Sequence, residues 1–423
     1  MGPTLIFDKS TLESLNPNES LWLDHFYLCN ITPMFYVETL ADLEKNVRHG
    51  RTPESVVGNI ANKTPEDGVL NVHYLQLLYH ELEGNNIIMD GRSHPSGSQK
   101  VELGDRKGVI IRDSKEEEAF KRWHKGEFLE VERLIAKKWR REIVYINKND
   151  TECKDIAEAI FGKFRKPDNL EDIKKEVDNL LNIPGNESFL KFCFSLLNIP
   201  SKLSDISLKN WKMGGQKSIR EFIPYFSYIV SVELFFYIAN AFNLLSMLPH
   251  KETQKIDLAY LYYLPFCNIF TSNDKFHIHI VPLFLEDNQT FISGEDLKAD
   301  LSNINLYYSL FPEEVKNTGI TTFALFPPTN KEFILTTMWD KYMSDKWRDM
   351  EKGHNIGNMN SNFSENKELL KNINQFEKEA KPCQNINNNQ EDLNEILVVR
   401  KIRASRGDWQ RFSQDVINAG KNI

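Results

Sequence analysis

Short apolar runs that end next to an acidic residue recur along the chain. The first run, Leu5–Phe7, is followed by Asp8 and then by a helical spacing of apolar residues over 9–15. A later run, Cys267–Phe270, leads directly into the sequence TSND at 271–274. In an open α/β sheet, ligands bind in the crevice outside the carboxyl ends of the strands. The pattern therefore predicts an α/β fold in which apolar strands end beside carboxylates.

Helical spacing of apolar residues covers much of the chain between these two runs. One predicted helix opens at Thr32 and Pro33, because proline is accepted in the first helical turn. Residues 87–113 instead hold short β-like runs divided by glycine, proline and serine, which is typical of hairpins. The predicted helices span 31–47, 52–65, 70–82 and 114–146, with smaller helices over 155–208 and a strand over 396–404 before a last helix at 409–417.

One predicted helix is apolar around its whole circumference. Residues 222–248 are long enough for a bilayer span of about 20 helical residues. The stretch is interrupted by Glu233, Asn240 and Asn243, and a carboxylate near the bilayer centre costs at least about 2.5 kcal/mol. A helix that is apolar on all sides can equally lie inside a large globular domain. We expect this second arrangement, without a membrane partner, and keep a membrane anchor as the alternative.

The charge balance excludes proteins that gather nucleic acid with a global positive field. Acidic residues outnumber basic residues by 60 to 52, so nucleic-acid binding needs a local basic cluster. One cluster places Lys138 and Arg140 on either side of Trp139, and a second surrounds Arg403 near the end of the chain. Each cluster is interpreted either as a solvated helix face or as a contact for a phosphate backbone.

The five cysteines lie far apart and include no CxxC pair. This spacing argues against a zinc site and against a disulfide framework, and it predicts a reducing, cytoplasmic location.

Four acidic residues stand where an α/β sheet would bring them together. Asp8 and Asp274 follow apolar strands, whereas Glu38 and Asp257 lie on helices. Taken singly, each is better explained as a cap or turn residue, although Ser10 opens a capping-box sequence, STLE, and is the better cap candidate in the first helix. Taken together, four carboxylates at one edge repel one another unless a cation neutralises them. Oxygen-only ligands favour Mg²⁺ or Mn²⁺.

The segments LIFDKS, ITPMFYVETL and IDLAYLYYLPFCNIFTSNDKF resemble the acidic motifs of PIN-domain nucleases. That family has an aspartate after the first strand, a glutamate on an early helix, an aspartate opening a later helix and an aspartate after the fourth strand. The corresponding residues here are Asp8, Glu38, Asp257 and Asp274, with Thr271 and Ser272 as hydroxyl residues beside the last. The resemblance covers roughly residues 4–85 and 220–285.

The resemblance implies a PIN-like three-layer α/β/α fold with a central parallel sheet. PIN domains are usually compact, so the long stretch between the two matching parts is predicted to be an inserted, mainly helical subdomain. The residues 355–394 are rich in asparagine, lysine and glutamate and predict a flexible segment. The implied units are 1–85 and 220–345 for the PIN-like domain, 86–219 for the insertion, 346–396 for the Asn-rich segment and 397–423 for a C-terminal strand and helix.

The resemblance also implies a function. The four acids would be catalytic residues that hold one or two Mg²⁺ or Mn²⁺ ions for phosphodiester hydrolysis. Asp42 shares a helix face with Glu38 and is an alternative ligand. The expected activity is endonucleolytic cleavage of single-stranded RNA. The residues expected to guide its backbone are Lys138, Trp139, Arg140 and Arg403.

Other interpretations stay open at this point. A PIN-like scaffold with a weak or empty acidic pocket would bind RNA or a protein partner without catalysis. A nuclease needs restraint, so a regulatory protein partner is expected, and a homodimer is the default oligomer. His277 and His279 alternate along a predicted strand, KFHIHI, so they share one face and metal binding is an alternative for them. Two histidines without a third ligand nearby are more often ordinary strand residues, which is the interpretation we favour.

Overall fold

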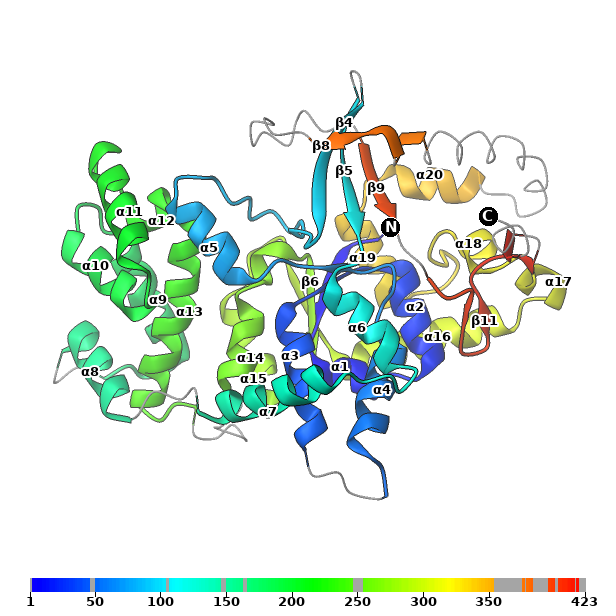
Figure 1. Cartoon of the computed structure of the whole chain (residues 1–423), viewed down its shortest axis with the longest axis horizontal. Coiled ribbons are helices and arrows are strands. Elements are labelled where there is room, and N and C mark those ends of the chain that lie inside the picture. Colours follow the sequence, from blue (N-terminus) through cyan, green and yellow to red (C-terminus); the bar gives the residue numbers. More distant parts are fainter. Residues whose placement is uncertain are drawn as a thin grey trace.

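A five-stranded parallel sheet lies at the centre of the molecule (Figure 1). Its strand order is β3-β2-β1-β6-β7, and every neighbouring pair is parallel. The strands are β1 (Thr4–Phe7), β2 (Leu28–Ile31), β3 (Val69–Leu70), β6 (Ile269–Ser272) and β7 (Thr290–Ser293). The computed structural model describes residues 2–45, 50–103, 106–145, 150–162, 166–245, 254–353, 375–376, 378–382, 395–399, 402–414 and 416–417. The predicted α/β class is confirmed, and the arrangement is compatible with a three-layer α/β/α fold.

The sheet joins two parts of the chain that are far apart in sequence. In the register of β1 and β6, Leu5 lies opposite Ile269. Both strands are buried along their whole length, which explains their apolar runs. The chain moves outward from β1 through β2 and β3 and then returns to the other side of β1 as β6. The edge between β1 and β6 is therefore the topological switch point of the sheet, where α/β proteins bind ligands.

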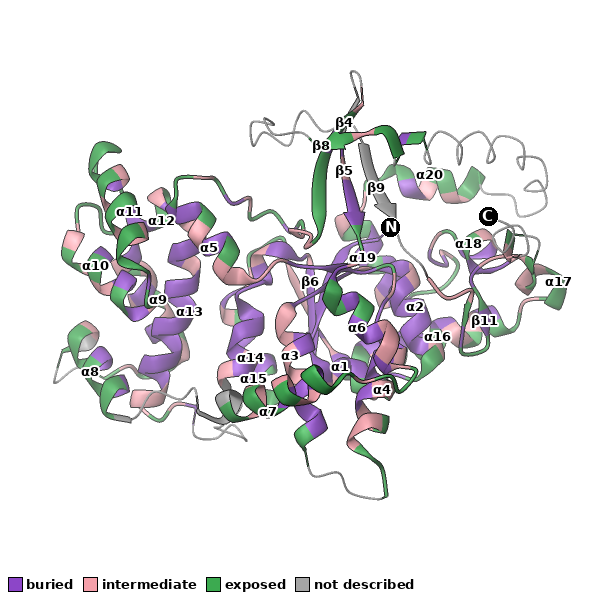
Figure 2. Ribbon diagram, in the orientation of Figure 1, coloured by how far each residue is buried: buried purple, intermediate pink, exposed green. Residues whose placement is uncertain are grey.

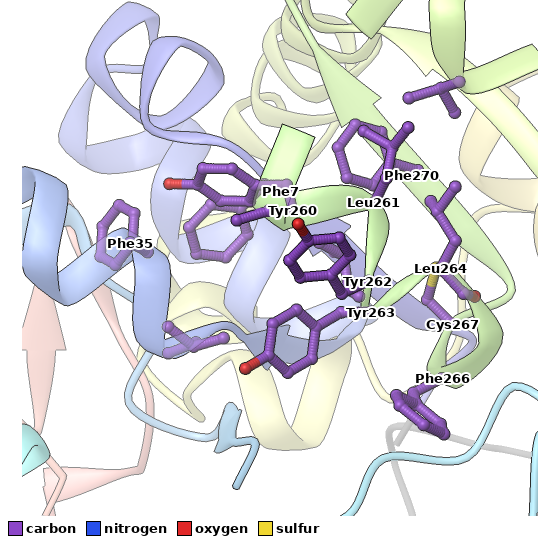
Figure 3. Close-up of a cluster of buried hydrophobic side chains, with 14 of the residues drawn as sticks. Phe7, Phe35, Tyr260, Leu261, Tyr262, Tyr263, Leu264, Phe266, Cys267 and Phe270 are labelled. Carbon is purple, nitrogen blue, oxygen red and sulfur yellow. The ribbon is translucent and has the colours of Figure 1, made fainter. Parts of the chain in front are cut away.

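The helices next to this sheet begin with strong capping signals. Thr32 caps α3 and Pro33 is its first residue, as predicted. The group consists of α1 (Lys9–Ser14), α2 (Pro17–Phe26), α3 (Pro33–Ala41), η1 (Asp42–Glu44), α4 (Pro53–Lys63), α14 (Gln254–Leu261), η2 (Leu264–Phe266), α15 (Lys275–Ile280), η3 (Val281–Leu283) and α16 (Gly294–Ser309). Figure 3 shows the segment from α14 to β6 packed beside Phe7 of β1 and Phe35 of α3.

A helical lobe surrounds the apolar helix α13 (Pro224–Ala241), which is buried on every face (Figure 2). The other members of the lobe are α5 (Tyr74–Leu82), α8 (Asp150–Phe161), α9 (Leu170–Leu181), α10 (Glu187–Leu196), α11 (Ser201–Met213) and α12 (Ile219–Phe222). Of these, α5, α8, α9 and α12 pack directly against α13. Helix α13 also packs against α14 and places Phe236 beside Phe276 of α15, so its apolar surface has neighbours in both the lobe and the sheet domain.

Within the described part of the chain, no helix combines the length and the apolarity needed to span a membrane.

The segment 86–145 does not join the helical lobe. Strands β4 (Ser98–Leu103) and β5 (Arg106–Arg112) form a small sheet with β8 (Lys381–Pro382) and β9 (Glu395–Val399). The predicted single helix over 114–146 is wrong: the chain forms α6 (Lys115–Trp123) and α7 (Glu130–Tyr145), separated by a turn in which Gly126 has a φ of 78°. A residue in the left-handed backbone conformation cannot continue an α-helix. The two helices therefore pack separately, α6 on α4 and α7 on α3 and η1.

The end of the described chain lies against the sheet domain. Helices α17 (Glu313–Lys316), α18 (Ile320–Phe323), α19 (Ile334–Tyr342) and α20 (Lys346–Gly353) lead to β10 (Ser405–Arg406) and β11 (Trp409–Gln410). Trp409, predicted in a terminal helix, lies instead in β11 and packs against Trp22. Most of the predicted Asn-rich segment lies outside the described residues.

In the predicted basic cluster around Arg403, the described arginines pair with acidic and amide side chains of the protein, while Arg400 and Lys401 lie outside the described residues. Arg406 and Arg411 are buried and form ion pairs with the buried Asp24. The guanidinium of Arg403 bonds to Glu66 and to Asn62. These arginines therefore tie the C-terminal segment to α2 and α4, because a buried carboxylate needs compensating charge.

We expect Arg411→Met to lower the free energy of unfolding by about 3 kcal/mol, because removing one partner leaves a buried charge undercompensated. Urea denaturation followed by circular dichroism would measure it. The matched control is Arg348→Met, which breaks an exposed pair with Asp340 and should cost less than about 1 kcal/mol. Equal effects of the two substitutions would contradict a structural role for the buried pair.

Candidate functional site at the switch point of the sheet

The candidate site lies at the carboxyl ends of β1 and β6. Phe7 and Thr271 are paired in the sheet, so the residues that follow them, Asp8 and Ser272, are brought side by side. The Oγ of Ser272 donates a hydrogen bond to Oδ2 of Asp8 at 2.6 Å. Thr271 contributes its backbone carbonyl, which accepts from the Asp8 amide at 3.3 Å. The predicted meeting of the two strand ends is therefore present.

Asp8 caps α1, contrary to the prediction that Ser10 does so. Its Oδ1 accepts from the backbone N–H of Thr11 at 2.9 Å. The hydroxyl of Ser10 donates to both carboxylate oxygens, at 2.9 and 2.7 Å, and accepts from the backbone N–H of Asn273 at 3.1 Å. The side chain of Asp8 is thus buried and surrounded by donors. Its hydrogen-bonding capacity is used within the protein, which the sequence could not reveal.

His277 lies in α15 and not in the predicted strand. Its Nδ1 is 2.9 Å from Ser272 Oγ and 3.3 Å from Asp8 Oδ2, while its Nε2 is 2.8 Å from the backbone carbonyl oxygen of Asp257. Since Ser272 already donates to Asp8, both ring nitrogens of His277 face acceptors. A doubly protonated imidazolium, which donates from both nitrogens, satisfies this arrangement.

Electrostatics agrees with an ion pair between Asp8 and His277. Burial lowers the pKa of His277, but the hydrogen bond to Asp8 and the charges of Asp8 and Asp257 outweigh it and raise the pKa to about 9. Burial raises the pKa of Asp8, but the hydrogen bond and the charge of His277 hold it below its usual value. The pair is charged at neutral pH.

Lys9 forms a second buried ion cluster next to the first. Its Nζ is 2.6 Å from Asp42 Oδ2, 3.3 Å from Glu13 Oε1 and 3.8 Å from Glu38 Oε1. Burial lowers the pKa of Lys9, but the charges of Glu38, Asp42 and Glu13 raise it above its usual value. Asp42, the alternative ligand on the face of Glu38, therefore points to Lys9.

The remaining predicted acids, Glu38, Asp257 and Asp274, lie beside the Asp8–His277 pair and the Lys9 cluster and are partly exposed. Tyr260 donates a hydrogen bond to Oε2 of Glu38 at 2.8 Å. Asp274 caps α15 by accepting from the backbone N–H of Phe276 at 2.7 Å. Burial raises the pKa of Glu38 and of Asp257, and like charges add to the effect: Asp8 acts on both, and Asp274 acts on Asp257. Neighbouring carboxylates therefore oppose the ionisation of Glu38 and of Asp257.

The donor set fits a hard divalent cation in part. Glu38, Asp257 and Asp274 offer partly exposed carboxylate oxygens, the ligand type that Mg²⁺ and Mn²⁺ prefer. Asp8 has its oxygens engaged by protein donors and fits a supporting role better. Among the residues that the structure describes, no three His, Cys, Asp or Glu side chains are arranged as a metal-binding group as they stand.

The predicted nucleic-acid contacts divide between two environments. Lys138 is exposed on α7, whereas Trp139 and Arg140 are half-buried and Trp139 packs against the core. Because α7 packs on α3 and η1, this helix lies beside the element that carries Glu38. Arg403 is bonded to Glu66 and Asn62 instead.

Sequence reasoning missed His277, Lys9 and Tyr260 as parts of this site. A signal existed for His277, because Asp274 is a strong helix cap and would have placed KFHIHI in a helix. Lys9 and Tyr260 carry no comparable pattern, since their partners are distant in sequence.

Comparison with family models, with curated proteins and with solved structures finds no match for this chain.

The ion pair of His277 predicts a pH-dependent stability. A histidine whose folded pKa is raised contributes stability that is fully present below its unfolded pKa of about 6.5 and is lost as the pH rises through about 9. The difference in unfolding free energy between the native protein and His277→Gln should therefore shrink by up to about 3 kcal/mol between pH 6 and pH 10.

Urea denaturation at a series of pH values, with EDTA present, would measure this difference. His279→Gln is the control, because His279 is exposed on the same helix. A difference that stays constant over the whole pH range would show that His277 is uncharged in the folded protein.

Proposed function

We propose that the chain is a PIN-like, metal-dependent nuclease. The observation that carries the proposal is the gathering of Asp8, Glu38, Asp257 and Asp274 at the switch point of a parallel sheet. Two of the partly exposed acids, Glu38 and Asp257, have raised pKa values. Carboxylates that resist ionisation in a partly exposed site are typical of functional sites, because a bound cation would relieve their repulsion.

The residues divide into ligands and supports. Glu38, Asp257 and Asp274 would hold Mg²⁺ or Mn²⁺, which when bound supplies an activated water and neutralises charge on a phosphodiester. Tyr260 orients the carboxylate of Glu38 through its hydrogen bond. Asp8 connects the ends of β1 and β6 through Ser272 and His277, and His277 fixes the backbone at Asp257. Such outer contacts commonly affect activity by 10–100-fold.

Single-stranded RNA is the proposed substrate, and α7 is its proposed contact. Exposed Lys137, Lys138 and Arg141 lie on this helix, which packs beside the helix of Glu38. A positively charged ridge next to an acidic centre would hold the phosphate backbone while the acids act on one phosphodiester. The expected regulatory partner, the homodimer and the cytoplasmic location stay predictions.

A catalytically weak or inactive PIN-like scaffold that binds RNA or a protein is the second candidate function. The observation that favours it is the engagement of both Asp8 oxygens by protein donors. An acid held in this way resembles a structural cap more than a metal ligand. Binding without cleavage would distinguish this candidate from a nuclease.

Cleavage of a mixed single-stranded RNA should require Mn²⁺ or Mg²⁺ and should fail in EDTA. We expect Asp257→Asn and Asp274→Asn each to lower the rate at least about 100-fold, more than the loss of an outer contact. Asp205→Asn, on an exposed face of α11, is the matched control and should keep the native rate. If no metal supports cleavage by the native chain while RNA still binds, the scaffold is the correct function.

RNA affinity should depend on α7 and on salt. Lys137→Ala with Arg141→Ala should weaken binding and should reduce the slope of log affinity against log salt by roughly 0.7 for each lost phosphate contact. Fluorescence anisotropy at several salt concentrations would measure this slope. The control pair, Lys202→Ala with Lys209→Ala on exposed positions of α11, should leave it unchanged. An unchanged slope in the α7 variant would place the RNA elsewhere.

A further inference from the structure

The ammonium of Lys9 occupies a position like that of a bound cation. Carboxylates of Asp42, Glu13 and Glu38 surround it at 2.6, 3.3 and 3.8 Å. The side chain of Lys9 is only 6% exposed and that of Asp42 only 3%. Carboxylates offset the cost of burying an ammonium. Lys9 and Asp42 therefore form the buried part of an ion cluster that Glu13 and Glu38 extend to the surface.

Glu38 connects the ion cluster of Lys9 to the partly exposed acids Asp257 and Asp274. One of its oxygens faces Lys9 and the other accepts from Tyr260, which lies on α14 three residues after Asp257. The charge of Asp8 is compensated by His277. Of the acids gathered at this edge, Asp257 and Asp274 have no such cationic neighbour within ion-pair distance in the described residues, and Glu38 shares its neighbour with Asp42.

We propose that Lys9 takes the place of a second metal ion, so that the site binds a single divalent cation on the side of Glu38, Asp257 and Asp274. This inference rests on the proposed function. It explains why Asp42 lies at the site and is nevertheless buried: its carboxylate is paired with the ammonium of Lys9. It also assigns Lys9 a positioning role, since the ammonium holds Glu38 between the lysine and the cation.

Repulsion from the ammonium of Lys9 supports one ion over two. At this edge, Lys9 and His277 already neutralise two of the six carboxylates of Asp8, Glu13, Glu38, Asp42, Asp257 and Asp274. One divalent cation among Glu38, Asp257 and Asp274 would neutralise half of the remaining charge, whereas a second would have to approach the ammonium of Lys9. Two positive charges a few ångströms apart in a buried site repel strongly. Removing the ammonium would instead leave Asp42 and Glu38 uncompensated and open a second position.

Isothermal titration of the full chain with Mn²⁺ tests this inference without any measurement of activity. We expect the native protein to bind one Mn²⁺ and Lys9→Met, which keeps a long unbranched side chain without the ammonium, to bind two. The matched control is Lys63→Met. Lys63 is also buried and lies near α1, but its Nζ donates to the backbone oxygen of Glu13 at 2.9 Å. Lys63→Met should therefore bind one ion.

Thermal unfolding provides a second readout if Lys9→Met is unstable. Without metal, the variant should unfold roughly 5–10 °C below the native protein, because a buried ion cluster has lost its cation. Added Mn²⁺ should raise the unfolding midpoint of the variant by more than it raises the midpoint of the native protein. If the variant is unfolded without metal, Mn²⁺ should refold it, as circular dichroism would show.

The outcomes separate this inference from the proposed function. Two ions in the native protein, or one ion in both proteins with no selective rescue by Mn²⁺, would overturn the role of Lys9 and leave a metal-dependent nuclease intact. A native protein that binds no Mn²⁺ would overturn both proposals.

Discussion

The parallel pairing of β1 with β6 joins residues that lie 264 positions apart in the chain. Both strands are short and fully buried, so their backbone groups have no water to bond with and must pair with each other. Asn268 strengthens the junction by accepting from the backbone N–H of Thr4 at 3.1 Å. Because α1 and α15 start where these strands end, the pairing decides which side chains meet at the site.

Buried charges in this molecule are arranged in compensated groups, as the cost of burying an isolated charge demands. Asp24 forms ion pairs with two arginines of the C-terminal segment. Asp42 forms an ion pair with Lys9, and Asp8 forms one with His277. Glu38 and Asp257 differ from these acids, because burial and neighbouring negative charge raise their pKa values.

A buried glutamate is one of the contacts between the helical lobe and the candidate site. Glu233 of α13 accepts hydrogen bonds from Lys255 and from Tyr262, which lie within and directly after α14. The same helix α14 carries Asp257 and Tyr260. The acidic residue that interrupts the apolar stretch therefore fixes the position of the helix bearing a site residue. Packing of the lobe and geometry of the site are linked by this contact.

The class of fold, the capped start of α3 and the burial of β1, β6 and α13 can be read from the sequence, because these features depend on local spacing of apolar and capping residues. The sequence also indicated Asp8, Glu38, Asp257 and Asp274 as residues that a parallel sheet would gather. Three features became visible in the fold alone: Asp8 faces His277, Asp42 faces Lys9, and Arg406 and Arg411 are buried. Those partners are set by which strands and helices lie side by side, and no local pattern records contacts between residues so far apart in the chain.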